Sequence, residues 1–141
     1  MPEETPVIVD SNILISALLN EDNSFLRLIL AGDYRLYICE LMVVELFKHK
    51  EKIIKASRLT EDEITRYYYN IIRKLNIFKE ELIEKAHWKK AYDLCKDIDE
   101  NDTPIVALTL ELDGRLLTGD KKLKEKLAGK GFDSFFTYPG S

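Results

Sequence analysis

The chain has 141 residues, 45% hydrophobic and 33% charged, so its length suits a single domain over residues 1–141 and its composition excludes a disordered or fibrous protein. The net charge of −4 excludes a protein that coats nucleic acid through a general excess of positive charge. No apolar run approaches the roughly 20 residues that span a bilayer, and the acidic start MPEET lacks a secretory-signal pattern, so we expect a cytoplasmic location without a membrane partner.

Short apolar runs alternate with helical patterns along the chain. In chain order the pattern predicts a strand at 6–9, helices at 13–19 and 24–31, a strand at 35–38, a long helix at 40–56, a helix that begins at Thr60, a short strand at 77–78, a helix at 80–98, a helix from Pro104 to about Gly114, a strand at 115–118, a helix at 121–128 and a strand at 132–138. Strands that alternate with helices predict the α/β class. We expect a three-layer α/β/α sandwich with a mostly parallel central sheet.

The helix that begins at Thr60 carries two independent signals. Thr60 and Glu63 have the spacing of a capping box. Apolar and tyrosine side chains then recur on one helical face, at Ile64, Tyr67, Tyr68, Ile71, Ile72 and Leu75. Tyr69 lies off this face and is the ring that we expect to be exposed.

Two of the predicted strands run into an aspartate. Residues 7–9 lead into Asp10, and residues 116–118 lead into Gly119 and Asp120. In a parallel sheet the carboxyl ends of the strands meet at one edge, where ligands bind, so we expect both carboxylates at the same edge. Taken alone, each aspartate is explained equally well as the N-cap of the helix that follows it.

Glu45 lies in LMVVELF, where its helical neighbours are apolar, so we expect its carboxylate beside the core. A charge in such a place needs a cation or a hydrogen-bonding partner. The alternative is a side chain that extends from the helix into solvent, and the two interpretations differ in whether Glu45 faces Asp10. His49 follows one turn later, which raises the hypothesis of a Glu–His metal pair. No HExxH motif is present, however, and a solvated histidine in the segment KHKEK is the simpler interpretation.

The segment DIDENDTPIVAL contributes Asp99 and Asp102. With Pro104 in the first helical turn, Asp102 stands at the helix entry, near free amides and the positive end of the helix dipole. By itself the segment is explained as a solvated acidic turn. Together with the three acids elsewhere in the chain it indicates an oxygen-ligand site for Mg²⁺ or Mn²⁺. Two such ions can hold a phosphodiester, activate water and stabilise the departing oxygen.

Four segments, VIVDSNILIS, the helix of Glu45, DENDTPIVALTLEL and LLTGDKKL, occur in an order that resembles the PIN-domain ribonucleases, including the toxins of toxin–antitoxin pairs. The resemblance covers nearly the whole chain. It implies a mostly parallel sheet between helices, Mg²⁺ or Mn²⁺ in an acidic pocket, and hydrolysis of single-stranded RNA. It also implies a homodimer and an antitoxin protein as partners.

The resemblance also implies the site residues. The catalytic, metal-binding acids would be Asp10, Glu45, Asp102 and Asp120, with Asp99 as a further metal ligand that only part of the family has. Asn12 and Thr118 match the polar residues that support these acids.

Two other functions stay open on the sequence alone. A haloacid-dehalogenase-type phosphatase shares the strand-end aspartate and the later Gly-Asp, but it needs a general acid where this chain has Asn12. A non-catalytic module that binds RNA or protein is supported by RYYYNIIRKL, in which tyrosines interleave with arginines as on stacking platforms for single strands.

Overall fold

The computed structural model describes residues 3–21 and 23–139. Its elements are β1 (Glu3–Val9), α1 (Ser11–Leu18), α2 (Ser24–Ala31), β2 (Tyr34–Cys39), α3 (Glu40–Lys48), α4 (Lys50–Ala56), α5 (Glu61–Lys74), β3 (Asn76–Phe78), the 3-10 helix η1 (Glu80–Leu82), α6 (Lys85–Cys95), the 3-10 helix η2 (Glu100–Asp102), α7 (Thr103–Glu111), β4 (Arg115–Leu117) and α8 (Lys121–Gly129). None of the helices in these residues is long and apolar enough to cross a membrane.

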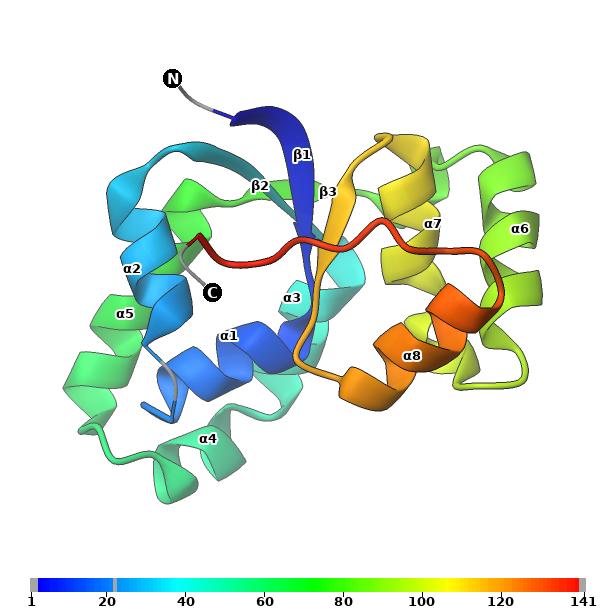
Figure 1. The fold of residues 1–141 in the computed structure, drawn as a ribbon. Helices are drawn as coiled ribbons and strands as arrows, with labels where there is room; N and C mark the ends of the chain where they lie inside the picture. Colours follow the sequence, from blue (N-terminus) through cyan, green and yellow to red (C-terminus); the bar gives the residue numbers. More distant parts are fainter. Residues whose placement is uncertain (1–2, 22, 140–141) are drawn as a thin grey trace.

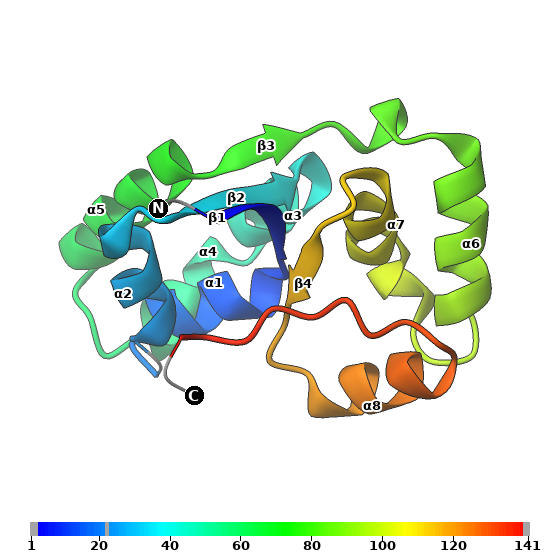
Figure 2. The same ribbon diagram turned by 45° about the horizontal axis from the view of Figure 1, so that its top comes forward.

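The four strands of the described residues form one sheet in the order β3-β2-β1-β4, and every pair is parallel. Helices α6 and α7 lie on one side of this sheet, and α1, α2 and α5 lie on the other (Figures 1 and 2). The predicted α/β class and the three-layer sandwich with a parallel central sheet are therefore confirmed. The carboxyl ends of all four strands point to one edge, where α1, α3 and α8 begin.

The centre of the core is formed by β1 and α7. Val7, Ile8 and Val9 are at most 1% exposed, and residues 105–108 of α7 are 0% exposed. Because helices cover both faces of the sheet, both sets of alternating strand side chains are buried. This explains why residues 7–9 of β1 form a continuous apolar run in the sequence and not an alternating one.

The predictions for α5 are confirmed in detail. Thr60 Oγ1 accepts a hydrogen bond from the amide of Glu63 at 3.2 Å, and Glu63 Oε1 accepts one from the amide of Thr60 at 3.0 Å. On the predicted apolar face Ile64 and Ile71 are buried, whereas Tyr69 is 60% exposed. The face therefore serves packing.

The helix predicted over 40–56 is wrong as a single element. In the structure α3 ends at Lys48 and α4 begins at Lys50, because the chain turns at His49 with φ −100° and ψ 9°. The turn redirects α4 so that Ile53 packs into the core at 6% exposure.

The helix predicted over 80–98 is also interrupted, into η1 and α6. Ile83, between the two, is buried at 4% exposure. The next amide, of Glu84, donates a 2.8 Å hydrogen bond to the Glu111 carboxylate of α7. Tertiary contacts therefore replace the helical hydrogen bonds that the local pattern favours.

The strand predicted over 132–138 does not form as such. The segment crosses β4 (red in Figure 1) and makes one isolated bridge, between Leu116 and Phe135. Leu116 donates to Ser134 O at 2.8 Å and accepts from Phe136 N at 2.9 Å. These two hydrogen bonds are the contact of the segment with the sheet, whereas β4 forms its three-residue ladder with β1 on the other side.

Gly114 allows the chain to approach β1 closely between α7 and β4. A Cβ atom there would lie 2.5 Å from Pro6 O and 2.7 Å from Ile8 Cδ1, so Gly114→Ala must displace backbone and should destabilise the protein by about 1–3 kcal/mol. Gly129, at the end of α8, has nothing within 4 Å of such a Cβ. Gly129→Ala should therefore be neutral or stabilising by up to about 1 kcal/mol. Urea denaturation compares the two variants, and equal losses would contradict this packing.

Candidate active site

The pairing of β1 with β4 brings the first two polar side chains of the site together. Val9 is in register with Leu117, so the next residues, Asp10 and Thr118, leave the sheet side by side. Thr118 Oγ1 donates a 2.8 Å hydrogen bond to Asp10 Oδ2. Both side chains are buried, at 6% and 2% exposure, so the Asp10 carboxylate is held in one orientation.

Asn12 and Asp120 extend this network across the edge of the sheet. Asn12 Nδ2 donates a 3.5 Å hydrogen bond to Thr118 Oγ1, and Asn12 Oδ1 accepts one from the amide of Gly119 at 3.4 Å. The amide of Asp120 donates to Thr118 Oγ1 at 3.2 Å. These contacts connect the start of α1 with the start of α8.

A cavity of about 410 Å³ opens beside α1 and α3 at this edge, next to the start of α7. Three of the predicted site acids line it, namely Asp10, Glu45 and Asp102, and its other polar lining residues are Ser11, His49 and Asn101. We call this the acidic cavity. Its acids come from the ends of β1 and η2 and from the middle of α3, so it is built only by the tertiary fold.

Asp120 and Asp99 lie outside the acidic cavity. Asp120 lines a neighbouring hollow together with Asn12, Gly119 and Tyr138. Asp99 is exposed, lines neither of these two spaces, and accepts a 3.0 Å hydrogen bond from the amide of Asn101 at the start of η2.

The N-cap explanation applies to the two strand-end aspartates differently. Asp120 Oδ1 accepts from the amide of Leu123 at 3.1 Å and so caps α8. Asp10 stands at the N-cap position of α1 but makes no side-chain cap hydrogen bond to that helix. Capping therefore accounts for one carboxylate. The other accepts hydrogen bonds from Thr118 at Oδ2 and from Ser11 Oγ at Oδ1, at 2.8 and 3.5 Å.

Glu45 is less buried than its apolar neighbours predict. Its side chain is 43% exposed, and its Oε2 lies 3.6 Å from Nε2 of His49, itself 47% exposed. The predicted position of the Glu45 carboxylate beside the core is wrong: the side chain lies in the wall of a solvent-accessible cavity. Leu41, one helical turn earlier, is also 43% exposed, so this face of α3 is not covered by the core. Glu45 nevertheless shares that cavity with Asp10.

Burial and mutual repulsion raise the pKa values of Asp10 and Asp102 at this edge. Burial is the largest cause that raises the pKa of Asp102, from 3.8 to about 7, and the negative charges of Asp10, Asp99 and Asp120 contribute to the same shift. Burial also raises the pKa of Asp10, against the effect of the hydrogen bond from Thr118. The edge therefore concentrates negative charge that favours either a proton or a cation.

The donor set fits a hard divalent cation. Within residues 3–21 and 23–139, no lysine or arginine forms an ion pair with Asp10, Asp102 or Asp120. In that same part of the chain the acids of this edge form no group of three whose ligand atoms all lie within 4.8 Å of one another. Such a cation would therefore have few direct protein ligands and would keep water molecules, which Mg²⁺ and Mn²⁺ accommodate.

Sequence patterns alone do not identify every polar residue of the region. Ser11 and Asn101 line the acidic cavity, and each is the sequence neighbour of a predicted acid, Asp10 or Asp102. Their position next to these acids is the signal by which the sequence could have identified them. A separate group, Glu84, His87 and Glu111, has ligand atoms within 4.8 Å of one another between α6 and α7. Glu84 and His87 are close in the sequence, but Glu111 lies far along the chain, so local spacing does not indicate the complete group.

The raised pKa of Asp102 predicts a specific pH dependence of stability. Between pH 4 and 7 the folded state holds a proton on Asp102 that the unfolded chain has released, so this group's contribution to the free energy of unfolding falls as the pH rises. In chelator, Asp102→Asn should therefore gain thermal stability relative to the unmodified protein as the pH rises from 4 to 8. Melting curves at each pH measure the difference. The exposed Asp62→Asn is the matched control, and a constant difference for Asp102→Asn would contradict the assignment.

Comparisons with known proteins identify the family and agree with the fold. The family model described as the PIN domain matches residues 8–131. The structure is similar to VapBC2 from Rickettsia felis bound to a DNA fragment from their promoter, with a TM-score of 0.63 and 16% identity over 85% of this chain and 92% of that chain. It is also similar to VapBC-1 from nontypeable Haemophilus influenzae, with a TM-score of 0.62 and 18% identity over 88% of this chain and 93% of that one. Comparison with curated proteins gives no match. The match of the family model over most of the chain shows that this protein belongs to the PIN-domain family.

Proposed function

We propose that the protein is a Mg²⁺- or Mn²⁺-dependent endoribonuclease that hydrolyses phosphodiester bonds of single-stranded RNA, and that residues 1–141 form one catalytic domain. The observation that carries the proposal is the acidic cavity, in which Asp10, Glu45 and Asp102 meet at the carboxyl edge of a parallel sheet. Membership of the PIN-domain family supports nuclease chemistry at this edge.

The proposal gives each acid a role. Asp10, Glu45, Asp102 and Asp120 act as the catalytic, metal-binding carboxylates, and Asp99 contributes negative charge and a further oxygen ligand at the start of η2. A divalent cation bound there would neutralise the phosphodiester and activate the attacking water.

Two polar residues position the acids. Thr118 donates to Asp10 Oδ2 at 2.8 Å and so holds the Asp10 carboxylate in place. Asn12 ties Thr118 to Gly119, which holds the start of α8 in place. Because the Asn12 side chain is used in these contacts and carries no carboxyl group, it cannot supply the general acid of a haloacid-dehalogenase-type phosphatase, and we do not propose that chemistry.

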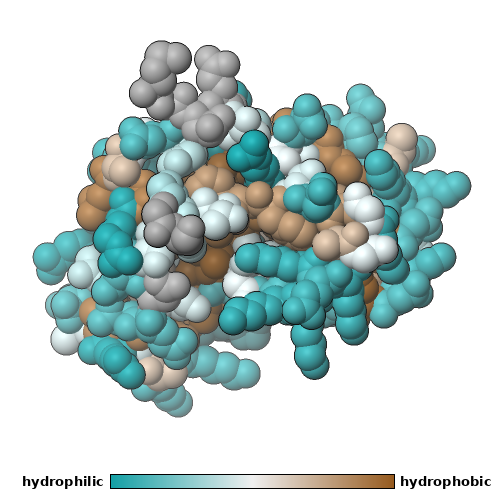
Figure 3. All heavy atoms as spheres, in the orientation of Figure 1, coloured by the Kyte–Doolittle hydropathy of each residue, from teal (hydrophilic) through white to brown (hydrophobic). Residues whose placement is uncertain are grey.

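A positively charged surface beside the acids supports an RNA substrate. The first turn of α8 begins at Asp120 and presents Lys121 and Lys122 as exposed side chains, with Lys126 one turn further. Hydrophilic side chains cover this part of the surface, seen in Figure 3 where Figure 1 shows α8. Lysines next to a site that binds cations can contact the phosphates that flank the scissile bond.

The test is RNA cleavage by the purified protein. With Mn²⁺ it should cut a mixed single-stranded RNA pool, and chelator should abolish the cutting. Asp10→Asn and Asp120→Asn should each lower the rate at least about 100-fold, because removal of one charged ligand weakens the stabilisation of developing charge by several kcal/mol. Gel electrophoresis of the products measures the rate.

Asp62→Asn, in the first turn of α5, removes one exposed carboxylate far from the cavity and should cut at the unmodified rate. Cleavage that survives Asp10→Asn would contradict the assignment of the site. RNA binding that needs no divalent ion and yields no products would favour the non-catalytic module instead.

We further infer that the protein acts as the toxin of a toxin–antitoxin pair, forms a homodimer and binds an antitoxin protein. The structural similarity to two VapBC complexes supports this inference. So does an apolar face on α3 next to the acidic cavity, where Leu41, Val44 and Phe47 are 43%, 44% and 64% exposed. Exposed apolar side chains at this spacing are typical of a surface that another protein covers.

Toxicity is measured by expression of the chain alone in a bacterial host. The unmodified protein should stop growth, and Asp10→Asn should not, because arrest requires cleavage of cellular RNA. Western blots that show equal amounts of both proteins are the control. Equal growth arrest by the two proteins would contradict a toxin that acts through this site.

A further inference from the structure

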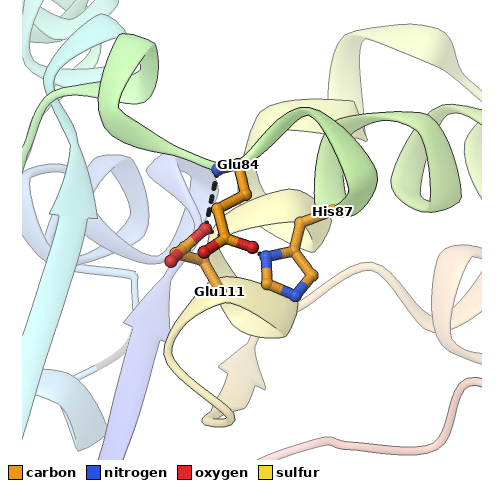
Figure 4. A group of neighbouring side chains, drawn as sticks. All are labelled: Glu84, His87 and Glu111. Carbon is orange, nitrogen blue, oxygen red and sulfur yellow. Dashed lines mark hydrogen bonds and ion pairs between the residues drawn. The ribbon is translucent and has the colours of Figure 1, made fainter.

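A second group of metal-ligating side chains lies between the N-terminal end of α6 and the C-terminal end of α7 (Figure 4). It consists of Glu84, His87 and Glu111, whose ligand atoms all lie within 4.8 Å of one another. The side chains of His87 and Glu111 are 31% and 19% exposed, and Glu84 is exposed. Figure 4 shows the two carboxylates and the imidazole ring pointing toward one another.

This group is separate from the acidic cavity. Asp102 precedes the first residue of α7, and Glu111 is the last residue of that helix. The helical rise places the two about 13 Å apart along the axis. A ligand of one group therefore does not reach the other, and this second group is independent of the proposed nuclease activity.

The hydrogen bonds within the group give a structural role to the side chains of His87 and Glu111, but not to that of Glu84. Glu111 Oε1 accepts a 2.8 Å hydrogen bond from the amide of Glu84 and lies 2.9 Å from Nδ1 of His87. The amide and then the imidazole hold the pKa of Glu111 below its usual value. These contacts fasten the start of α6 to the end of α7, but they use the backbone of Glu84 and not its carboxylate.

The group carries more negative than positive charge. Within the part of the chain that the structure describes, neither Glu84 nor Glu111 forms an ion pair with a lysine or an arginine. Two carboxylates therefore face one imidazole. When the ring proton sits on Nδ1, it lies between the ring and Glu111 Oε1. When it sits on Nε2, the Nδ1 lone pair faces that oxygen, and a cation can bind between the two atoms.

The geometry points to a binding site for a divalent transition-metal ion, of which Zn²⁺ is the representative, formed by Glu84, His87 and Glu111. The imidazole selects this class over Mg²⁺ and Ca²⁺, which prefer oxygen ligands alone. Ligand atoms around tetrahedral Zn²⁺ lie roughly 3.3–3.6 Å apart, given metal–ligand distances near 2.0–2.2 Å. The separation of 2.9 Å between Nδ1 and Oε1 is already close to this, and rotation of the exposed Glu84 side chain brings in the third ligand.

Ion binding here fastens α6 to α7. The ion would link Glu84, the N-cap residue of α6, and His87 in its first turn with the last residue of α7, so it should stabilise the folded chain in proportion to its occupancy. With three protein ligands, water fills the remaining position.

The test is a Zn²⁺ titration of the full chain after treatment with chelator, in the presence of excess Mg²⁺ to compete at the oxygen ligands of the acidic cavity. Calorimetry should give about one equivalent of bound Zn²⁺, and the thermal midpoint should rise by several degrees. Glu84→Gln should weaken Zn²⁺ binding at least about tenfold. This variant keeps both contacts of Glu111, because neither uses the Glu84 side chain. Glu81→Gln, a change of the same kind at an exposed neighbour, should bind as the unmodified protein does.

A spectroscopic signature separates ligation from a purely structural role. Co²⁺ in place of Zn²⁺ should give visible d–d absorption in the unmodified protein and in Asp10→Asn, and His87→Ala should lose it while circular dichroism shows that the variant is folded. The proposal is overturned if the unmodified protein binds no Zn²⁺ in excess Mg²⁺, or if Glu84→Gln and His87→Ala bind as tightly as it does. It is also overturned if Asp10→Asn removes the binding, since the ion would then lie in the acidic cavity.

Discussion

The parallel pairing of β1 with β4 is the constraint on which the candidate active site depends. Its register joins Val9 to Leu117, and this alone sets Asp10 beside the hydroxyl group of Thr118. A slip by one residue would turn Thr118 to the other face of the sheet. Close packing of Gly114 against β1 fixes the same register from the opposite end of β4. Apolar packing at one end of the strands therefore decides the chemistry at the other.

The same constraint makes the site costly in stability. Bringing Asp10 and Asp102 to one edge partly buries both, and burial with repulsion raises both pKa values. A cation or a proton relieves that repulsion, so the folded state is least stable where neither binds. Residues selected only for stability would not gather in this way, and such local conflict between stability and charge is typical of functional sites.

What the sequence predicts well is local, and what it misses depends on contacts between distant segments. Asp10 and Asp120 follow apolar runs, so their place at the strand ends was predictable, as was the capping box of Thr60. The interruption of the helix predicted over 80–98 was not predictable. At this point the amide of Glu84 donates its hydrogen bond to Glu111, a residue far along the chain. The half-exposed position of Glu45 depends likewise on how α3 packs, which its apolar neighbours do not reveal.

The pairing of α6 with α7 places the two groups of ligating residues at opposite ends of the same pair of helices. The two helices are joined by the segment from Lys96 to Asp102, which carries Asp99 and leads into the acidic cavity. At the other end of the pair, Glu111 holds the start of α6 through Glu84 and His87. The middle of α7 is fully buried, so one packed core holds both ends of this helix. Asp102 and Glu111 therefore depend on the same apolar packing of α7, although no side chain spans the distance between them.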